Sequence, residues 1–206
     1  MEFFKETWEF TKQDVLAIVN NLYIDGQITD QQKHGILVCI PNNSDPVRIE
    51  DYRPLILLNS DYKLLTRIIG NRICQWMTDI IQKSQHCGHG NTIFDAAAAL
   101  RDVVAYAEIS GTQLCILSID FNEAFDKISH DYLFELLRIY DFSERFQRRI
   151  KGVYDRATSS IQINGHRSHP IPIRSSVRQG CPLSMLLFVL CLNPLIRTLE
   201  QNLTGI

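Results

Sequence analysis

Two carboxylates follow an apolar run in the middle of the chain. Residues 114–119 read LCILSI, Asp120 follows directly, and Asp126 comes six residues later. A carboxylate at the end of a buried strand loses its water and needs a compensating partner. Asp120 therefore either caps a following helix or binds a hard cation such as Mg²⁺, which prefers carboxylate oxygen. We expect Asp126 to fix the turn locally rather than to share a metal.

Two further segments carry residue types suited to binding a ligand. In VRQGCPLS (177–184), Gly180 permits close approach of the backbone, and Gln179 can hydrogen-bond a ligand from the same edge. Taken alone, this segment is equally compatible with a loop that enters a helix. In EDYRPL (50–55), Arg53 either pairs with Asp51 or grips a triphosphate, for which the planar guanidinium is well suited.

The elements that must position these residues are expected from hydrophobic periodicity and turn signals. Residues 114–119 are the clearest strand, apolar throughout and therefore expected to be covered on both faces. Asn164-Gly165 predicts a hairpin, with a loop wider than two residues. The pattern indicates an α+β fold with a small antiparallel sheet. Expected helices are 3–23, 60–83, 93–108, 123–140, 143–155 and 183–201, the last interrupted or kinked at Pro194, and the other expected strands are 35–40, 55–58, 159–163 and 171–174.

Charge is unevenly distributed although the net charge is only −2. Residues 1–51 hold nine acids against four Lys/Arg, whereas residues 143–180 hold eight Lys/Arg against two acids. The basic stretch offers a surface to an anionic partner, or it is merely a solvated helix face. The candidate nucleic-acid contacts in it are Arg145, Arg148, Arg149, Arg156 and Arg178.

The six cysteines contain no CxxC pair, and we expect them to be reduced core residues. His86, Cys87 and His89 lie close together but do not have the spacing of a zinc site. No signal peptide or membrane-spanning run is present in the sequence, so we expect an intracellular protein, cytoplasmic or nuclear.

Four segments, in this order, resemble the reverse transcriptase domain of LINE-type (non-LTR) retrotransposons. They are DYRPLILLNSDYKLLTRIIGNRI, SIDFNEAFDKISHDYL, SSIQINGHRSHPIPI and VRQGCPLSMLLFVLCLNPL. The likeness extends from the first helix to the last residue. It implies the right-hand polymerase fold, with residues 1–112 fingers-like and residues 113–206 palm-like with some fingers segments. No thumb is expected in these residues.

The resemblance also implies roles for individual residues. Asp120 resembles the first metal-binding aspartate of the palm, and the backbone carbonyl of Phe121 would be a further ligand. Phe125 resembles the aromatic residue that rejects a 2′-hydroxyl on the incoming sugar. Gln179 and Gly180 would lie against nucleotide and template, and Arg53 would hold the triphosphate. The implied partners are an RNA template, a DNA primer and dNTPs, and the implied cofactor is a pair of Mg²⁺ ions.

One departure from the family bears on activity. The palm of this family needs a second hairpin with an Asp-Asp pair, and no such pair occurs in the 206 residues. We therefore expect a partial reverse transcriptase domain that ends before this hairpin and is inactive by itself. The alternatives are a non-catalytic remnant that binds RNA or a hybrid, and a non-functional retroelement fragment.

Overall fold

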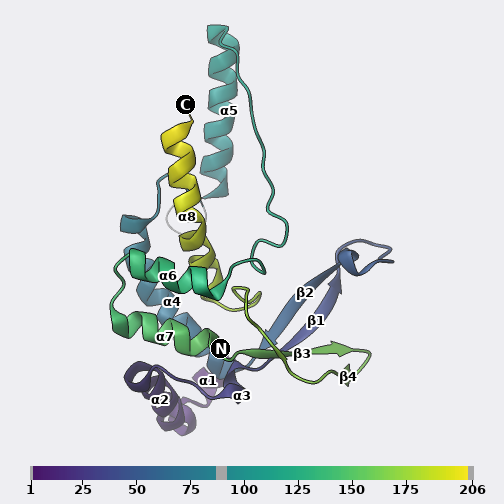
Figure 1. Ribbon diagram of the computed structural model, residues 1–206, viewed down its shortest axis with the longest axis vertical. Helices are drawn as coiled ribbons and strands as arrows, with labels where there is room; N and C mark the ends of the chain where they lie inside the picture. The colour runs from purple at the N-terminus through teal and green to yellow at the C-terminus, as the bar shows by residue number, and fades with distance from the viewer. Residues whose placement is uncertain (1, 87–91, 204–206) are drawn as a thin grey trace.

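Helices pack together beside a small sheet in the computed structural model, which describes residues 2–86 and 92–203 (Figure 1). Their bounds are α1 (Glu2–Glu6), α2 (Trp8–Asp25), α3 (Asp30–Lys33), α4 (Ser60–Ile80), α5 (Ile93–Ser110), α6 (His130–Ile139), α7 (Glu144–Tyr154) and α8 (Ser184–Asn202). The strands are β1 (Gly35–Pro41), β2 (Tyr52–Leu58), β3 (Thr158–Ile163), β4 (His166–Arg167) and β5 (Ile171–Pro172), and η1 (Ile49–Asp51) is a 3-10 turn. The predicted α+β class is confirmed. Residues 87–91, between the helices predicted at 60–83 and 93–108, lie outside the described residues.

The sheet is mixed, not antiparallel as predicted. Its strand order is β2-β1-β3-β4, and β5 also pairs with β3. β1 runs antiparallel to β2 but parallel to β3, because the chain returns to the sheet only after α4 to α7. β2 is an edge strand, which explains why it tolerates Pro54.

The predicted hairpin at Asn164-Gly165 is confirmed, but its loop is tighter than expected. Ile163 pairs with His166, so only two residues lie between β3 and β4. Both have positive φ angles, 48° at Asn164 and 82° at Gly165, as a type I′ turn requires.

The hydrophobic core lies among the helices rather than against the sheet alone. One stripe of α4, comprising Leu65, Ile69, Ile73 and Met77, is almost completely buried. It belongs to one cluster with apolar side chains of α6, α7 and α8. The spacing of four residues places this stripe on one helical face.

Two glycines let α7 approach the end of α2 closely. A Cβ atom at Gly152 would lie 1.8 Å from the carbonyl oxygen of Gly26. Gly26 itself has φ 68°, and its N–H donates to the carbonyl of Leu22, which ends α2. Any larger residue at 152 would push the two helices apart.

Residues 114–119 contradict the clearest strand prediction. They have no regular secondary structure, and every residue from 112 to 121 is exposed. Leu117 is 79% exposed and Ile119 62%. A strand needs a neighbour for its backbone hydrogen bonds, and among the described residues no strand pairs with this segment. Figure 1 shows it running down beside α5 as an extended trace.

The helix predicted at 123–140 begins later than expected. Residues 122–127 form turns, and α6 starts only at His130. No helix begins at residue 121, so Asp120 is not a helix cap. The helix predicted at 3–23 is divided into α1 and α2 at Thr7. Pro194 lies inside α8, which continues past it to Asn202.

The cysteine prediction is correct only in part. No disulfide joins the five described cysteines, and Cys181 and Cys191 are buried in the core, whereas Cys39 and Cys115 are exposed. Cys87 and His89, part of the rejected zinc cluster, lie outside the described residues. Of the helices within residues 2–86 and 92–203, none has both the length and the apolar character needed to cross a bilayer.

Candidate active site

A carboxylate joins the two main candidate segments. The Oδ1 atom of Asp126 accepts a hydrogen bond from the Ser176 hydroxyl at 2.9 Å, and Oδ2 accepts one from the Gln179 amide at 3.1 Å. The N–H of Val177 also donates to the carbonyl of Phe125 at 2.9 Å. The turn at 122–128 is thus fixed to residues 176–179, some 50 positions further along the chain.

Asp126 therefore does more than the sequence indicated. The prediction gave it a local role in its own turn, but it holds a distant loop. Ser176 completes the link with a φ angle of 90°, a value that L-residues seldom adopt. No sequence signal identified Ser176, because a single serine carries no recognisable pattern by itself.

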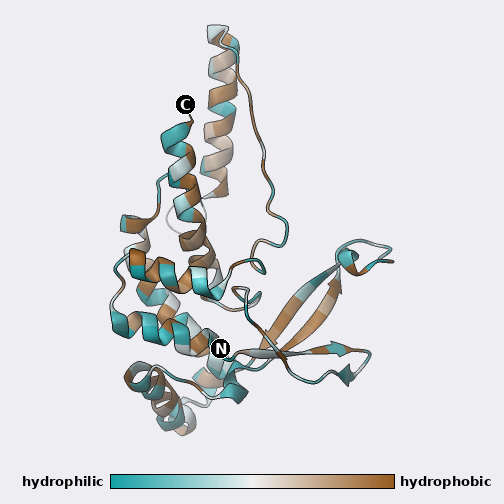
Figure 2. Cartoon of the chain, in the orientation of Figure 1, coloured by the Kyte–Doolittle hydropathy of each residue, from teal (hydrophilic) through white to brown (hydrophobic). Residues whose placement is uncertain are grey.

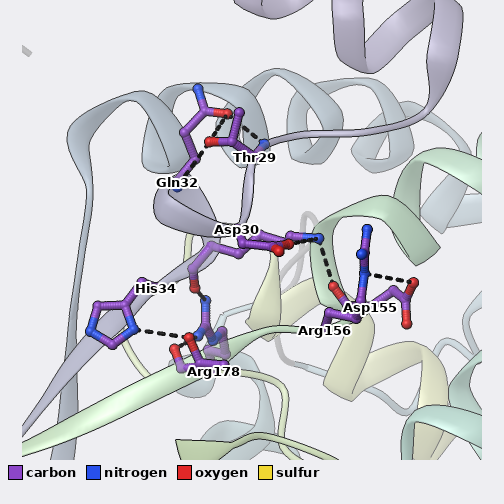
Figure 3. Close-up of polar contacts among 9 residues, drawn as sticks. Thr29, Asp30, Gln32, His34, Asp155, Arg156 and Arg178 are labelled. Carbon is purple, nitrogen blue, oxygen red and sulfur yellow. Dashed lines mark hydrogen bonds and ion pairs between the residues drawn. The ribbon is translucent and has the colours of Figure 1, made fainter. Parts of the chain in front are cut away.

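The side chain of Arg178, shown in Figure 3, anchors the same loop to two backbone carbonyls. This side chain is completely buried, and its guanidinium donates to the carbonyls of Lys33 at 2.5 Å and Thr158 at 2.8 Å. The predicted contact of Arg178 with nucleic acid is therefore wrong. A buried guanidinium bound to backbone carbonyls positions the loop and offers no surface to a phosphate.

Lys33 supports this anchor from α3. Its ammonium group donates to the carbonyl of Asp155 at 2.7 Å and lies 3.4 Å from a carboxylate oxygen of Asp30. Lys33 is 2% exposed, and a buried ammonium is tolerated only with such partners. The contacts tie the start of β1 to the start of β3, next to the loop.

Gly180 brings the loop against β2. Its φ angle is 95°, and a Cβ atom there would lie 2.9 Å from the carbonyl oxygen of Ile56 and 3.9 Å from Cδ1 of Leu55. Arg53 and Leu55 are two residues apart on β2, so their side chains point to the same face. Arg53 therefore lies on the same face of β2 as Leu55, and the side chain of Leu55 is close to Gly180.

Arg53 does not pair with Asp51, which removes one of its two predicted alternatives. The Asp51 carboxylate instead accepts hydrogen bonds from the backbone of Val47 and Arg48 and from the amide of Asn43. These backbone hydrogen bonds, that of Arg48 first, lower the pKa of Asp51. Arg53 is exposed, and no carboxylate of the described chain lies within ion-pairing distance of it.

Phe125 packs on the first turns of α8. Its ring stacks on that of Phe188, with centroids 4.9 Å apart and an interplanar angle of 22°. The ring is half-buried, so the contact with Phe188 fixes its position while part of it remains accessible. The 122–128 turn thus holds Phe125 and the loop holds Gln179 in one connected unit.

Asp120 and Phe121 stand apart from this unit. Both are exposed and belong to the irregular stretch between α5 and the turn at 122–128. Asp120 makes no hydrogen bond or ion pair with the described residues. Nor do those residues contain a group of three or more His, Cys, Asp or Glu side chains that could hold a metal ion. Within residues 2–86 and 92–203, Asp120 is therefore an isolated exposed carboxylate and not part of a metal-binding cluster.

The remaining candidate arginines lie elsewhere on the molecule. Arg145 and Arg148 are exposed on α7, and Arg149 is half-buried against α2. Arg156 is exposed after α7 and lies 3.9 Å from the carboxylate of Asp155 (Figure 3). None of these four touches the loop at 176–180 in any hydrogen bond or ion pair of the described residues.

Comparison with known proteins identifies a family for most of the chain. The family described as reverse transcriptase (RNA-dependent DNA polymerase) matches residues 40–205. A transposon TX1 uncharacterized 149 kDa protein of Xenopus laevis is 31% identical over the whole chain, which covers 16% of that protein. The Pol polyprotein of the Drosophila melanogaster retrotransposable element R2DM is 26% identical over 92% of the chain, which covers 18% of it.

A third relative carries the activity in its name. The RNA-directed DNA polymerase from the mobile element jockey of Drosophila melanogaster is 27% identical over 84% of this chain. The chain spans less than a fifth of the length of each of these three relatives.

Proposed function

Because this chain belongs to the reverse transcriptase family, of the type found in LINE-type (non-LTR) retrotransposons, we propose that it forms the fingers and part of the palm of an RNA-directed DNA polymerase. Residues 1–112 are the fingers-like part, and residues 113–206 the palm-like part. The polymerase copies an RNA template by adding dNTPs to the 3′-hydroxyl of a DNA primer.

One observation carries this proposal. The link from Asp126 to Ser176 and Gln179, together with the contact of Gly180 with β2, joins three segments that the sequence singled out separately. Their junction leaves Arg53 exposed and without an acidic partner among the described residues, as an arginine that binds a triphosphate requires.

Each residue at this junction has a distinct role in the proposal. Arg53 binds the triphosphate of the incoming nucleotide, and Phe125, fixed by Phe188, contacts its sugar and excludes a 2′-hydroxyl. Gln179 and Gly180 lie against the nucleotide and the template. The φ angle of Gly180 and its approach to β2 exclude a side chain there, which lets the loop lie directly against β2.

Asp120 supplies a carboxylate and Phe121 a carbonyl, both hard oxygen donors of the kind that Mg²⁺ prefers. One carboxylate does not hold two ions, and the described residues contain no metal-binding cluster. When bound, Mg²⁺ would stabilise the attacking and leaving oxygens. The further carboxylates come, in this proposal, from an Asp-Asp hairpin that these 206 residues do not contain. The chain alone is therefore inactive.

Primer extension on a primed RNA template, with Mg²⁺ and dNTPs, tests this proposal. We expect no product from the 206-residue chain, and product from a longer polypeptide that continues through an Asp-Asp hairpin. Asp120→Ala in that polypeptide should reduce extension by at least a thousandfold, since an essential ligand is lost. Glu108→Ala, an exposed acid on α5, is the matched control and should change extension less than twofold.

Two results would contradict the proposal. Extension by the 206-residue chain itself would show that it is catalytically complete. Extension by the longer polypeptide that survives Asp120→Ala would show that Asp120 is not a metal ligand.

A further inference from the structure

We propose that α7 and the end of α2 form a second binding site, a pocket that holds the sugar–phosphate backbone of a nucleic-acid strand. The choice of nucleic acid rests on the proposed function, but the site is distinct from the candidate active site. It consists of a cavity of about 360 Å³ that shares no residue with that site. The lining residues are Tyr23, Ile24, Gly26, Arg145, Arg148 and Arg149.

The pocket exists because the two helices cross at glycines. Gly152 brings α7 against the backbone of Gly26, where α2 ends. A Cβ atom at Gly26 would lie 2.7 Å from Cγ of Arg148, so the aliphatic part of Arg148 lies directly over this glycine. Figure 1 shows α7 lying beside the end of α2, away from the sheet.

Tyr23 gathers two guanidinium groups at one side of the pocket. The guanidinium carbon of Arg149 lies 4.0 Å from the Tyr23 ring centroid, and that of Arg72, from α4, lies 4.4 Å from it. Arg149 also donates to the carbonyl of Tyr23 at 3.1 Å. Its Nε atom, in contrast, is buried and has no hydrogen-bond partner in the described part of the chain.

No acidic side chain neutralises this concentration of positive charge. Among residues 2–86 and 92–203, no carboxylate lies within 4.0 Å of the guanidinium groups of Arg72, Arg145, Arg148 or Arg149. Two other surface arginines are paired: Arg101 with Asp102, and Arg138 with Glu135. Of the arginines that line the pocket, the exposed Arg145 and Arg148 are therefore available to an external anion.

A purely structural role explains only part of the cluster. The C-terminal end of a helix attracts cations, and this accounts for Arg149, which bonds a carbonyl of α2. It does not account for Arg145 and Arg148, which are exposed and make no hydrogen bond with the described residues. Several guanidinium forks around one cavity suit phosphate groups, which each fork can bind through two hydrogen bonds.

The test is binding of a fluorescein-labelled 12-nucleotide oligouridylate to the full 206-residue chain, measured by anisotropy from 50 to 200 mM salt. The double variant Arg145→Gln/Arg148→Gln removes two exposed guanidinium groups, so the fold should be unaffected. We expect its Kd to rise at least tenfold at 100 mM salt. The slope of log K against log salt should fall by about one to two, since two phosphate contacts are lost.

The matched control is Arg101→Gln/Arg138→Gln, which removes the same charge from two exposed, paired arginines and should change Kd less than twofold. An equal loss in both variants, or no loss in either, would contradict the pocket. So would failure of the unmodified chain to bind at 50 mM salt, or tighter binding of a phosphoserine peptide of equal charge. None of these results bears on primer extension through Asp120, so the polymerase proposal would stand.

Discussion

The helical core and the segment formed by residues 92–121 both contain many apolar residues but differ in what they bury. The core stripe on α4 is at most 1% exposed, from Leu65 to Met77. In the segment, Phe94 is 80% exposed and Ile109 88%. Figure 2 shows hydrophobic residues along α5, which extends past the end of α8 at the top of the view. Apolar residues thus specify where burial is possible, whereas a packing partner decides whether it occurs.

The two parts of this segment also differ from each other. α5 forms with little tertiary packing, with Ala107 as its buried residue, because its ends are capped locally. Thr92 and Asp95 make a capping box, and Gly111 ends the helix with φ 68°. Residues 114–119 have no equivalent, because the hydrogen bonds of a strand come from another strand. A helix can be completed locally, but a strand cannot.

The largest expected effect comes from making the same substitution in the helical core and in the segment formed by residues 92–121. Ile69→Ala in α4 should lower the free energy of unfolding by about 2–5 kcal/mol, because it leaves a cavity in a closely packed cluster. Ile109→Ala, the same change at an 88% exposed position of α5, should lie within about 0.5 kcal/mol of the parent. Urea denaturation of both variants measures this. Equal effects would mean that α5 is packed in solution.

A smaller effect is expected at the crossing of α2 and α7. Gly152→Ala should destabilise the chain by about 1–3 kcal/mol, since the new Cβ atom meets the carbonyl of Gly26. Alanine is otherwise the better helix former by about 1 kcal/mol, so a loss of stability reports the clash itself. A gain of stability would show that the helices are further apart.

The two carboxylates that opened the sequence analysis should behave differently. Asp126→Ala should cost about 1–3 kcal/mol, because it leaves Ser176 and Gln179 without their acceptor. Asp120→Ala should change the free energy of unfolding by less than about 0.5 kcal/mol, since Asp120 has no partner in the described chain. Thermal unfolding compares the two. A large loss at Asp120 would reveal a contact that supports the fold.

The smallest expected effect is a pH dependence from His130, at the start of α6. Burial is the largest effect on His130 and lowers its pKa below 6.5. The hydrogen bond to the Ser176 carbonyl opposes this, Arg178 lowers the pKa further, and Asp131 and Asp155 raise it slightly. As the pH falls, His130 therefore becomes protonated at a higher pH in the unfolded chain than in the folded one. Stability from this residue is full above about pH 6.5 and decreases as the pH falls below it.

His130→Gln should reduce this part of the pH dependence, because glutamine does not titrate and can still donate to the Ser176 carbonyl, which His130 Nε2 now contacts at 3.1 Å. Unfolding midpoints measured at pH 7.5 and 5.5 give the comparison. An unchanged difference between the two pH values would assign it to other groups.

Sequence by itself determined the elements that depend on local signals. The amphipathic stripe of α4, the presence of a hairpin at Asn164-Gly165 and the helix α5 all follow from residues close together in the chain, although the length of the hairpin loop was predicted wrongly. The motifs around Arg53, Asp120 and Gln179 were also recognisable, since each is a short contiguous pattern. The order of these patterns along the sequence indicated that the chain belongs to the reverse transcriptase family.

Only the tertiary structure decided how distant segments meet. Three contacts join residues more than 20 positions apart: the parallel pairing of β1 with β3, the hydrogen bond from the buried Arg178 to Lys33, and the hydrogen bond from Ser176 to Asp126. The same holds for the pocket between α2 and α7, where Tyr23 meets Arg149. Such contacts depend on the packing of whole helices, and local residue patterns carry no information about which surfaces will face one another.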